Sequence, residues 1–189
     1  MKLKLAETEL TVGYEVVAAM TAVLLLDRSN RVVCCFLAAV LHELGHLLMM
    51  RLLHVRVRAF RLRLFDMLIE ADEPATRRDD ILITLGGPAV NLLCFAALYP
   101  FSRKLSLPHL ALGVFNLLPA LSLDGGHLLE IILLKKYNPR AVSIVLKLMT
   151  FLFLLPLLTA GVYLLLNSGY NYSLLAISLY LLTVLLLKK

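Results

Sequence analysis

Several long apolar runs, separated by short polar breaks, constrain the fold of this chain more than any other feature. A helix needs roughly 20 apolar residues to cross a hydrocarbon core about 30 Å thick. Apolar residue types make up 60% of the sequence, well above the ~45–50% that is usual for soluble domains. The sequence therefore predicts an all-α membrane protein with about six transmembrane helices, near residues 10–26, 32–53, 81–99, 109–134, 141–166 and 173–187.

The distribution of basic residues predicts how these helices are oriented. With the N-terminus inside, the outer side keeps only four of the 19 Lys and Arg residues, namely Arg28, Arg31, Arg103 and Lys104. Because cytoplasmic loops carry the excess of Lys and Arg, we expect both termini in the cytoplasm and a multi-pass location, most simply a bacterial cell membrane. The net charge of +6 then reflects topology and contact with anionic lipid, and we expect no nucleic-acid partner.

A short stretch after the second run changes to the period of a strand. Apolar and arginine residues alternate over 55–64, with a slip at Ala59 and Phe60 that indicates a bulge. The segment "KLKL" at 2–5 alternates in the same way. We expect a short β-ribbon at the cytoplasmic face. Its arginines could simply meet lipid phosphates, or its free edge could also capture an extended peptide by strand addition.

The stretch "HELGH" at 42–46 places three ionisable groups inside an apolar run, where they are costly and by default functional. At 100° per residue, His42 and His46 lie 40° apart around a helix, so both imidazoles can reach one metal ion. Glu43 lies beside that pair and can hold a metal-bound water as a general base. The pattern predicts a zinc site of one ion per chain.

Catalytic zinc sites usually have three protein ligands, so a further ligand is needed. Asp124 lies in "FNLLPALSLDGGH", a polar interruption of the fourth run. In the expected topology, the second and fourth runs point the same way, and Asp124 matches the two histidines in membrane depth. Pro119 and the Gly125–Gly126 pair loosen the helix there, as is tolerated beside a water-lined cavity. Asp124 is therefore the candidate third ligand.

These motifs resemble the site-2 protease family of intramembrane zinc metalloproteases. That family pairs H-E-x-x-H, here 42–46, with a downstream N-x-x-P-x(4)-D-G element, here Asn116 to Gly125, and "GGPAVN" at 86–91 is a further similar feature. The resemblance covers about residues 36–134. The compact chain is most similar to the sporulation stage IV branch, which processes a sigma-factor precursor.

The resemblance implies that His42, His46 and Asp124 bind zinc and that Glu43 is the acid-base residue. Asn116 would position the scissile peptide or its oxyanion. We expect one metalloprotease domain over 1–189, with its catalytic core at about 32–134, acting on a membrane-associated or transmembrane protein near the cytoplasmic side. The first two helices and the ribbon would guide the substrate, while the last two would pack or regulate. A regulatory partner is compatible with this interpretation.

Other polar residues have simpler interpretations. His127 could donate to Asp124 or serve as a helix cap, and His54 and His109 fall near predicted membrane boundaries as interfacial residues. Asn91 favours a hydrogen bond between helices, with substrate contact as the alternative. Gly45 permits close helix packing.

Two other functions use the same residues. A membrane metal-ion carrier could transport through His42, His46 and Asp124, but it has no need for Glu43. A catalytically inactive relative could bind transmembrane segments, although its ligands would be expected to decay.

Overall fold

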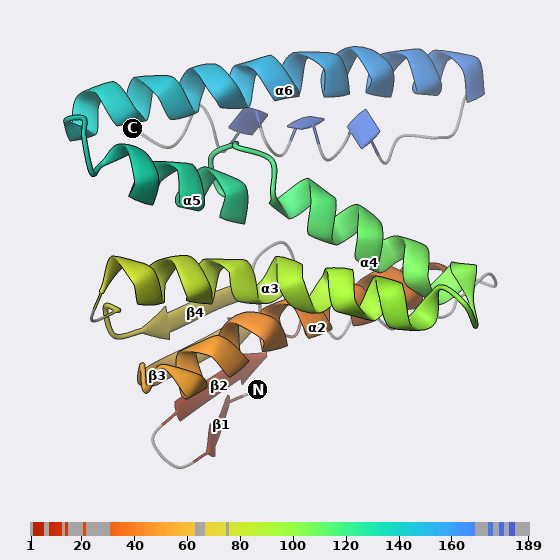
Figure 1. Cartoon of the computed structure of the whole chain (residues 1–189). Coiled ribbons are helices and arrows are strands. Elements are labelled where there is room, and N and C mark those ends of the chain that lie inside the picture. Colours follow the sequence, from red (N-terminus) through yellow and green to blue (C-terminus); the bar gives the residue numbers. More distant parts are fainter. Residues whose placement is uncertain are drawn as a thin grey trace. The chain divides into compact units, whose positions relative to one another are not determined.

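The computed structural model describes residues 2–5, 8–12, 31–62, 67–74 and 76–168, together with Tyr14, Thr21 and a few positions between 174 and 183. The chain divides into two compact units, Met1–Phe115 and Asn116–Lys189. The first contains a sheet and most of three helices, and the second contains two further helices (Figure 1). The expectation of a single domain over 1–189 stays a prediction.

The sheet has four strands, in the order β1-β2-β3-β4. Strand β1 (Lys2–Leu5) and β2 (Thr8–Val12) are antiparallel, β2 and β3 (Val57–Leu62) are parallel, and β3 and β4 (Met67–Ala71) are antiparallel. The parallel pair needs a long crossover, and the segment that joins β2 to β3 contains the helix α2 (Arg31–Leu52). The strand predicted at 2–5 is thus confirmed, and the one predicted at 55–64 is confirmed over 57–62, within a sheet larger than a ribbon. Residues 63–64 lie outside the described residues.

Two details of the strand prediction differ. The register irregularity lies between Val57 and Ala59, next to the slip that the sequence placed at Ala59 and Phe60. Residues 10–12 belong to β2, so the first predicted membrane run begins too early. Most of that run, like most of 173–187, lies outside the described residues.

Helix α2 packs against α3 (Arg77–Leu98) through glycine. A Cβ on Gly86 would lie 2.6 Å from the carbonyl oxygen of Gly45, and one on Gly45 would overlap the carbonyl oxygen of Gly86. The two backbones therefore touch, which side chains at either position would prevent. Helix α3 starts at an N-cap, where the backbone N–H of Asp79 donates to Thr76 Oγ1 over 3.2 Å.

The predicted fourth run is divided in the structure. Helix α4 (Arg103–Asn116) ends where the second unit begins, a turn follows over 117–123, and α5 (Asp124–Leu133) starts at Asp124. The break at Pro119 was anticipated from the sequence. Neither half reaches the length of a spanning helix.

Helix α6 (Pro139–Ser168) contributes buried apolar side chains to the second unit. Leu121 of the turn packs with Val142 and Leu146 of α6 in a buried cluster. The backbone N–H of Leu121 also donates to Thr150 Oγ1 over 2.8 Å, which gives this buried group a partner. The turn before α5 is thus anchored on α6.

Among the described residues, three helices are long and apolar enough to cross a membrane: α2, α3 and α6. They match the predicted runs 32–53, 81–99 and 141–166 closely. The chain is mostly helical with apolar spanning helices, as expected, while the number of six spans stays a prediction.

Candidate metal centre

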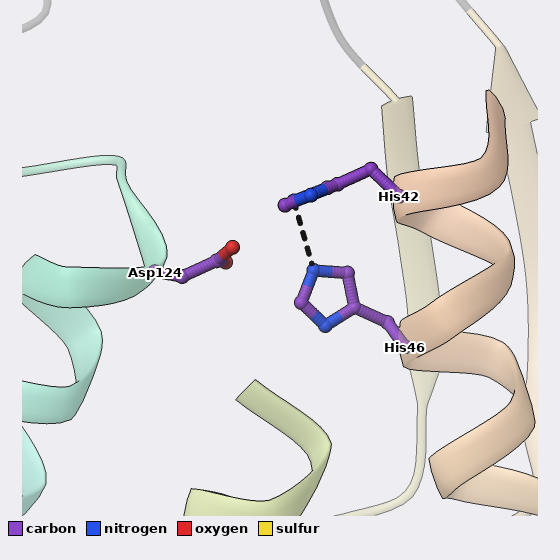
Figure 2. Close-up of side chains that lie close together, drawn as sticks. All are labelled: His42, His46 and Asp124. Carbon is purple, nitrogen blue, oxygen red and sulfur yellow. Dashed lines mark hydrogen bonds between the residues drawn. The ribbon is translucent and has the colours of Figure 1, made fainter. Parts of the chain in front are cut away.

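His42 and His46 of α2 bring two imidazole nitrogens to one point. Their Nε2 atoms are 3.2 Å apart, and the rings meet edge to face with centroids 4.9 Å apart (Figure 2). Both side chains are buried. The 40° offset expected from helical spacing is therefore realised as a pair of convergent nitrogen ligands.

Each imidazole is fixed through its other nitrogen by helix α3. His46 Nδ1 donates to the carbonyl oxygen of Ile83 over 2.8 Å. His42 Nδ1 lies 3.1 Å from Nδ2 of Asn91, whose side chain is completely buried. Such hydrogen-bond partners fix the orientation of an imidazole ring and raise the basicity of its ligand nitrogen.

Gly87 lets these nitrogens lie close against the backbone of α3. A Cβ at Gly87 would lie 2.8 Å from His42 Nε2 and would overlap His46 Nε2. Only a glycine in this turn of α3 is compatible with the present ring positions. Two imidazole nitrogens that converge on one point are donors that suit zinc, so these residues fit the metal that the sequence predicts.

Glu43 follows His42 on α2 and is half-buried. Its position places it 100° around the helix from His42, beside the imidazole pair. This position is compatible with a carboxylate that accepts and donates protons beside the two imidazoles.

Asn116 and Asp124 stand at the two ends of the turn in the second unit. Asn116 is the last residue of α4, and Asp124 is the first residue of α5 (Figure 2), where the helix N-terminus favours a carboxylate. The start of α5 lies directly against the turn. A Cβ on Gly125 would overlap the carbonyl oxygen of Leu117, and one on Gly126 would overlap that of Ala120. The glycine pair therefore sets where Asp124 projects from the turn.

The remaining polar residues differ in how well they were anticipated. Asn91 does link helices, as predicted, since its Oδ1 is 2.9 Å from His109 Nδ1 of α4. His109 is buried at 3% exposure and does not have the exposed character of an interfacial residue. The sequence did offer one signal for this contact. Asn91 and His109 are polar residues in two consecutive predicted apolar runs, and such residues tend to pair between helices.

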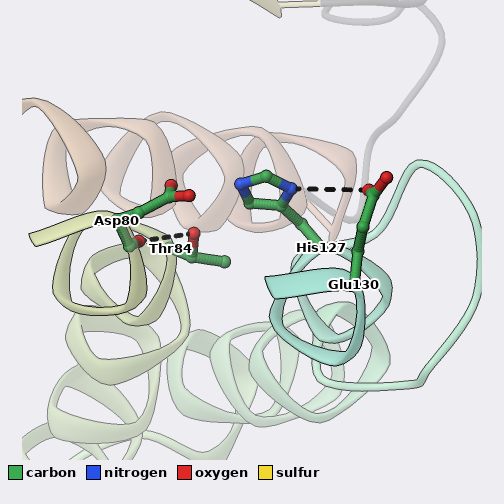
Figure 3. Close-up of polar contacts among 4 residues, drawn as sticks. All are labelled: Asp80, Thr84, His127 and Glu130. Carbon is green, nitrogen blue, oxygen red and sulfur yellow. Dashed lines mark hydrogen bonds and ion pairs between the residues drawn. The ribbon is translucent and has the colours of Figure 1, made fainter. Parts of the chain in front are cut away.

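Two polar pairs lie outside this set (Figure 3). His127 Nδ1 is 3.9 Å from Glu130 Oε2 on the surface of α5. Thr84 Oγ1 donates to the backbone oxygen of Asp80 over 2.8 Å within α3. Both are contacts within one helix.

Comparison with known proteins gives a consistent assignment. Residues 94–156 match the sequence model of "Peptidase family M50", and this segment contains both Asn116 and Asp124. The chain is 33% identical over 116 residues to a zinc metalloprotease of Methanocaldococcus jannaschii, covering 54% of this chain and 34% of the relative. It is 34% identical over 109 residues to a candidate zinc metalloprotease of Synechocystis sp., covering 50% and 29%.

This chain is similar to peptidase family M50 and its zinc metalloproteases over part of its length. Its fold is that of the site-2 protease from Methanocaldococcus jannaschii, with a TM-score of 0.70 over 96% of this chain and 91% of that one, at 23% sequence identity. The chain spans about a third of the length of the two metalloproteases above.

Proposed function

We propose that this chain is a zinc-dependent intramembrane endopeptidase that cuts a membrane-associated or transmembrane protein. The observation that carries the proposal is the convergence of two buried Nε2 atoms, 3.2 Å apart, on a helix apolar enough to span a membrane. Ionisable groups inside a membrane cost free energy, so their presence there indicates a function. The absence of a side chain at Gly87 lets both nitrogens lie close together, which supports a shared metal ion as that function.

In this proposal, His42 and His46 supply two zinc ligands and Asp124 supplies the third. Three protein ligands leave a fourth position open, as catalytic zinc requires. Asp124 starts α5, directly before two glycines and after a turn that is anchored on α6. This placement supports a carboxylate that is held in one direction.

Zinc, when bound, acts as a Lewis acid that makes water nucleophilic near neutral pH. Glu43 accepts the proton of that water as it attacks the scissile carbonyl carbon. Glu43 then donates the proton to the leaving amine as the C–N bond breaks. Asn116 donates a hydrogen bond to the scissile peptide or to the oxygen that gains negative charge. One water is consumed, and a carboxyl and an amine end are formed.

The substrate would approach in extended form, since helical peptide bonds are shielded by their own hydrogen bonds. The four-stranded sheet of the first unit supports this step, because β4 pairs with β3 on one side only among the described residues. Pairing with the edge of β4 as an added strand would hold the substrate backbone in an extended conformation before cleavage. The arginines of 55–64 would at the same time hold the sheet at lipid phosphates.

The orientation and regulation of the site belong to the same proposal. Both termini would face the cytoplasm of a bacterial cell, and cleavage would occur near that side, as in regulated intramembrane proteolysis. Similarity to the sporulation stage IV branch would make the substrate a membrane-associated precursor and would allow for a regulatory partner.

A metal-ion carrier is the alternative that uses the same histidines, and Glu43 separates the two. The chain 1–189 in liposomes should cleave a single-span substrate, and Glu43→Gln should abolish cleavage while zinc content stays near one ion per chain. Glu130→Gln, which alters an exposed carboxylate on α5, is the matched control and should cleave normally. Cleavage by Glu43→Gln at the wild-type rate would refute the mechanism, and zinc uptake into liposomes without cleavage would favour the carrier.

A catalytically inactive, segment-binding relative would show the opposite pattern. It would retain a single-span protein in pull-down experiments with no product formed by the wild-type chain. The presence of both histidines, the glutamate and a partner network around the rings favours the active enzyme.

A further inference from the structure

The turn between α3 and α4 carries the most exposed large apolar side chain among the described residues. Phe101 is 86% exposed, and Tyr99 beside it is 44% exposed. The backbone N–H groups of Phe101 and Ser102 both donate to the carbonyl oxygen of Leu98, over 3.0 and 2.8 Å. The backbone N–H of Leu105 donates to Ser102 Oγ over 3.4 Å. Phe101 therefore projects from a turn that is closed by its own hydrogen bonds.

The start of α4 carries the only charged side chains in a long stretch of the sequence. Between Asp80 and Asp124 the chain has no acidic residue, and Arg103 and Lys104 are its only Lys or Arg residues. Both are exposed. They lie in the first turn of α4, where the positive end of the helix dipole disfavours a cation. An anion from outside the chain would offset this repulsion.

The guanidinium of Arg103 lies against the aromatic side of the turn. Its Cζ atom is 5.7 Å from the centroid of the Tyr99 ring, within the range of a cation–π contact. The Tyr99 ring lies 5.2 Å from that of Phe95, one helical turn earlier on α3. A guanidinium above a ring still presents N–H donors at its edge, with the geometry that binds phosphate oxygens. The end of α3 and the start of α4 thus form one surface with an aromatic side and a cationic side.

The length of α3 decides which environment meets this surface. The helix is long and apolar enough to cross a membrane. Its 22 residues extend about 33 Å at 1.5 Å per residue, against a hydrocarbon core of about 30 Å. Its first turn holds the charged residues Arg77 to Asp80, which belong at one membrane surface. Its other end therefore reaches the opposite surface, where aromatic and basic side chains meet lipid headgroups.

We propose that Tyr99, Phe101, Arg103 and Lys104 form a binding surface for anionic phospholipid. Both rings lie at the boundary of the acyl chains, and both cations contact headgroup phosphates. The inference rests on α3 spanning a membrane, and it depends neither on the zinc site nor on the peptidase reaction. Because side-chain and backbone groups of α3 hold the two imidazoles, an anchored end of this helix also limits movement of the metal centre across the membrane.

Tryptophan fluorescence tests where the surface lies, because the chain has no tryptophan of its own. The variant Phe101→Trp of chain 1–189, in liposomes of phosphatidylcholine and phosphatidylglycerol, emits from position 101 alone. Lipids brominated near the headgroup should quench this emission more than lipids brominated near the acyl-chain ends. Stronger quenching by the deep bromines, or a water-like emission without quenching, would overturn the inference. A blue-shifted emission without quenching would overturn it too, because protein rather than lipid would then cover the turn.

The preference for one headgroup tests the two cations. In equimolar mixtures, bromine is placed either on phosphatidylglycerol or on phosphatidylcholine, and the ratio of quenching gives the preference for the anionic lipid. We expect about fivefold or more, since each Lys or Arg near an anionic surface strengthens association by about that factor. The double variant Arg103→Gln and Lys104→Gln should reduce the preference to less than about twofold. No preference with both cations present, or an unchanged preference without them, would overturn the inference.

A second pair of basic residues provides the matched control. Lys135 and Lys136 are also adjacent and exposed, and they follow α5. Changing both to Gln in the Phe101→Trp chain removes the same charge and should leave the headgroup preference at position 101 as it was. Loss of the preference in this variant would show that the net charge of the chain attracts the lipid, and it would overturn the assignment to Arg103 and Lys104.

Discussion

Gly87 of α3 lies against the imidazole of His46 so closely that the two could not coexist if position 87 carried a side chain. The same missing Cβ would lie 2.8 Å from His42 Nε2. The metal centre is therefore shaped by an absent side chain on one helix as much as by the histidines on another.

Substitution Gly87→Ala tests this relationship. The added methyl group would overlap His46 Nε2 and displace the rings, which should weaken zinc binding at least tenfold. The chain should still fold, because alanine favours a helix over glycine. Zinc competition titration together with helical circular dichroism measures both effects. Ala89→Ser, on the exposed side of α3, should bind zinc as the wild type does. Unchanged affinity in Gly87→Ala would show that the ring positions against Gly87 do not determine zinc binding.

Substitution Gly45→Ala tests the contact of α2 with α3. The Cβ would overlap the carbonyl oxygen of Gly86, so the helices must separate at a cost of about 1–3 kcal/mol in the free energy of unfolding. Unfolding in mixed detergent measures this change. Leu44→Ala, at a neighbouring exposed position, should cost much less, and equal losses in both variants would contradict the close backbone contact.

Substitution Thr150→Val tests the anchor of the turn on α6. The backbone N–H of Leu121 would lose its acceptor and the second unit should be destabilised by about 1–3 kcal/mol. Hydrogen exchange of the amide of Leu121 should accelerate accordingly. Thr159→Val removes an exposed hydroxyl from the same helix and should leave that amide unaffected; slow exchange in both variants would contradict the anchor.

Substitution Gly125→Ala tests the turn that carries Asn116 and Asp124. The added Cβ would overlap the carbonyl oxygen of Leu117, which would displace Asp124 from its direction and should lower peptidase activity at least tenfold. Cleavage of a single-span substrate at saturating zinc measures this loss. Ser143→Ala, at an exposed position near the start of α6, is the control. Full activity in Gly125→Ala would show that the turn does not position the site.

Local patterns in the sequence were sufficient for much of this structure. The 42–46 spacing predicted two convergent histidines, and the alternation over 2–5 and 55–64 predicted strands. The polar interruption around Pro119 predicted the break between α4 and α5. Each of these follows from the period of a helix or strand, or from the effect of proline and glycine on the backbone.

Features that depend on distant packing were not predictable in the same way. The parallel pairing of β2 with β3 joins residues on either side of α2, and the short strand "TELTV" has no clear alternation of its own. The burial of His109 follows from the contact of α4 with Asn91. Likewise, the role of Gly87 becomes visible only when α3 is placed on α2.

The central claim is that His42, His46 and Asp124 hold the zinc ion, and zinc X-ray absorption of the purified chain tests it most directly. The account predicts about one zinc per chain, with only nitrogen and oxygen neighbours at roughly 2.0–2.2 Å and a scattering pattern of two imidazoles. His46→Ala should remove one imidazole or the metal itself. Sulfur neighbours at about 2.3 Å, or an unchanged two-imidazole pattern in His46→Ala, would contradict it.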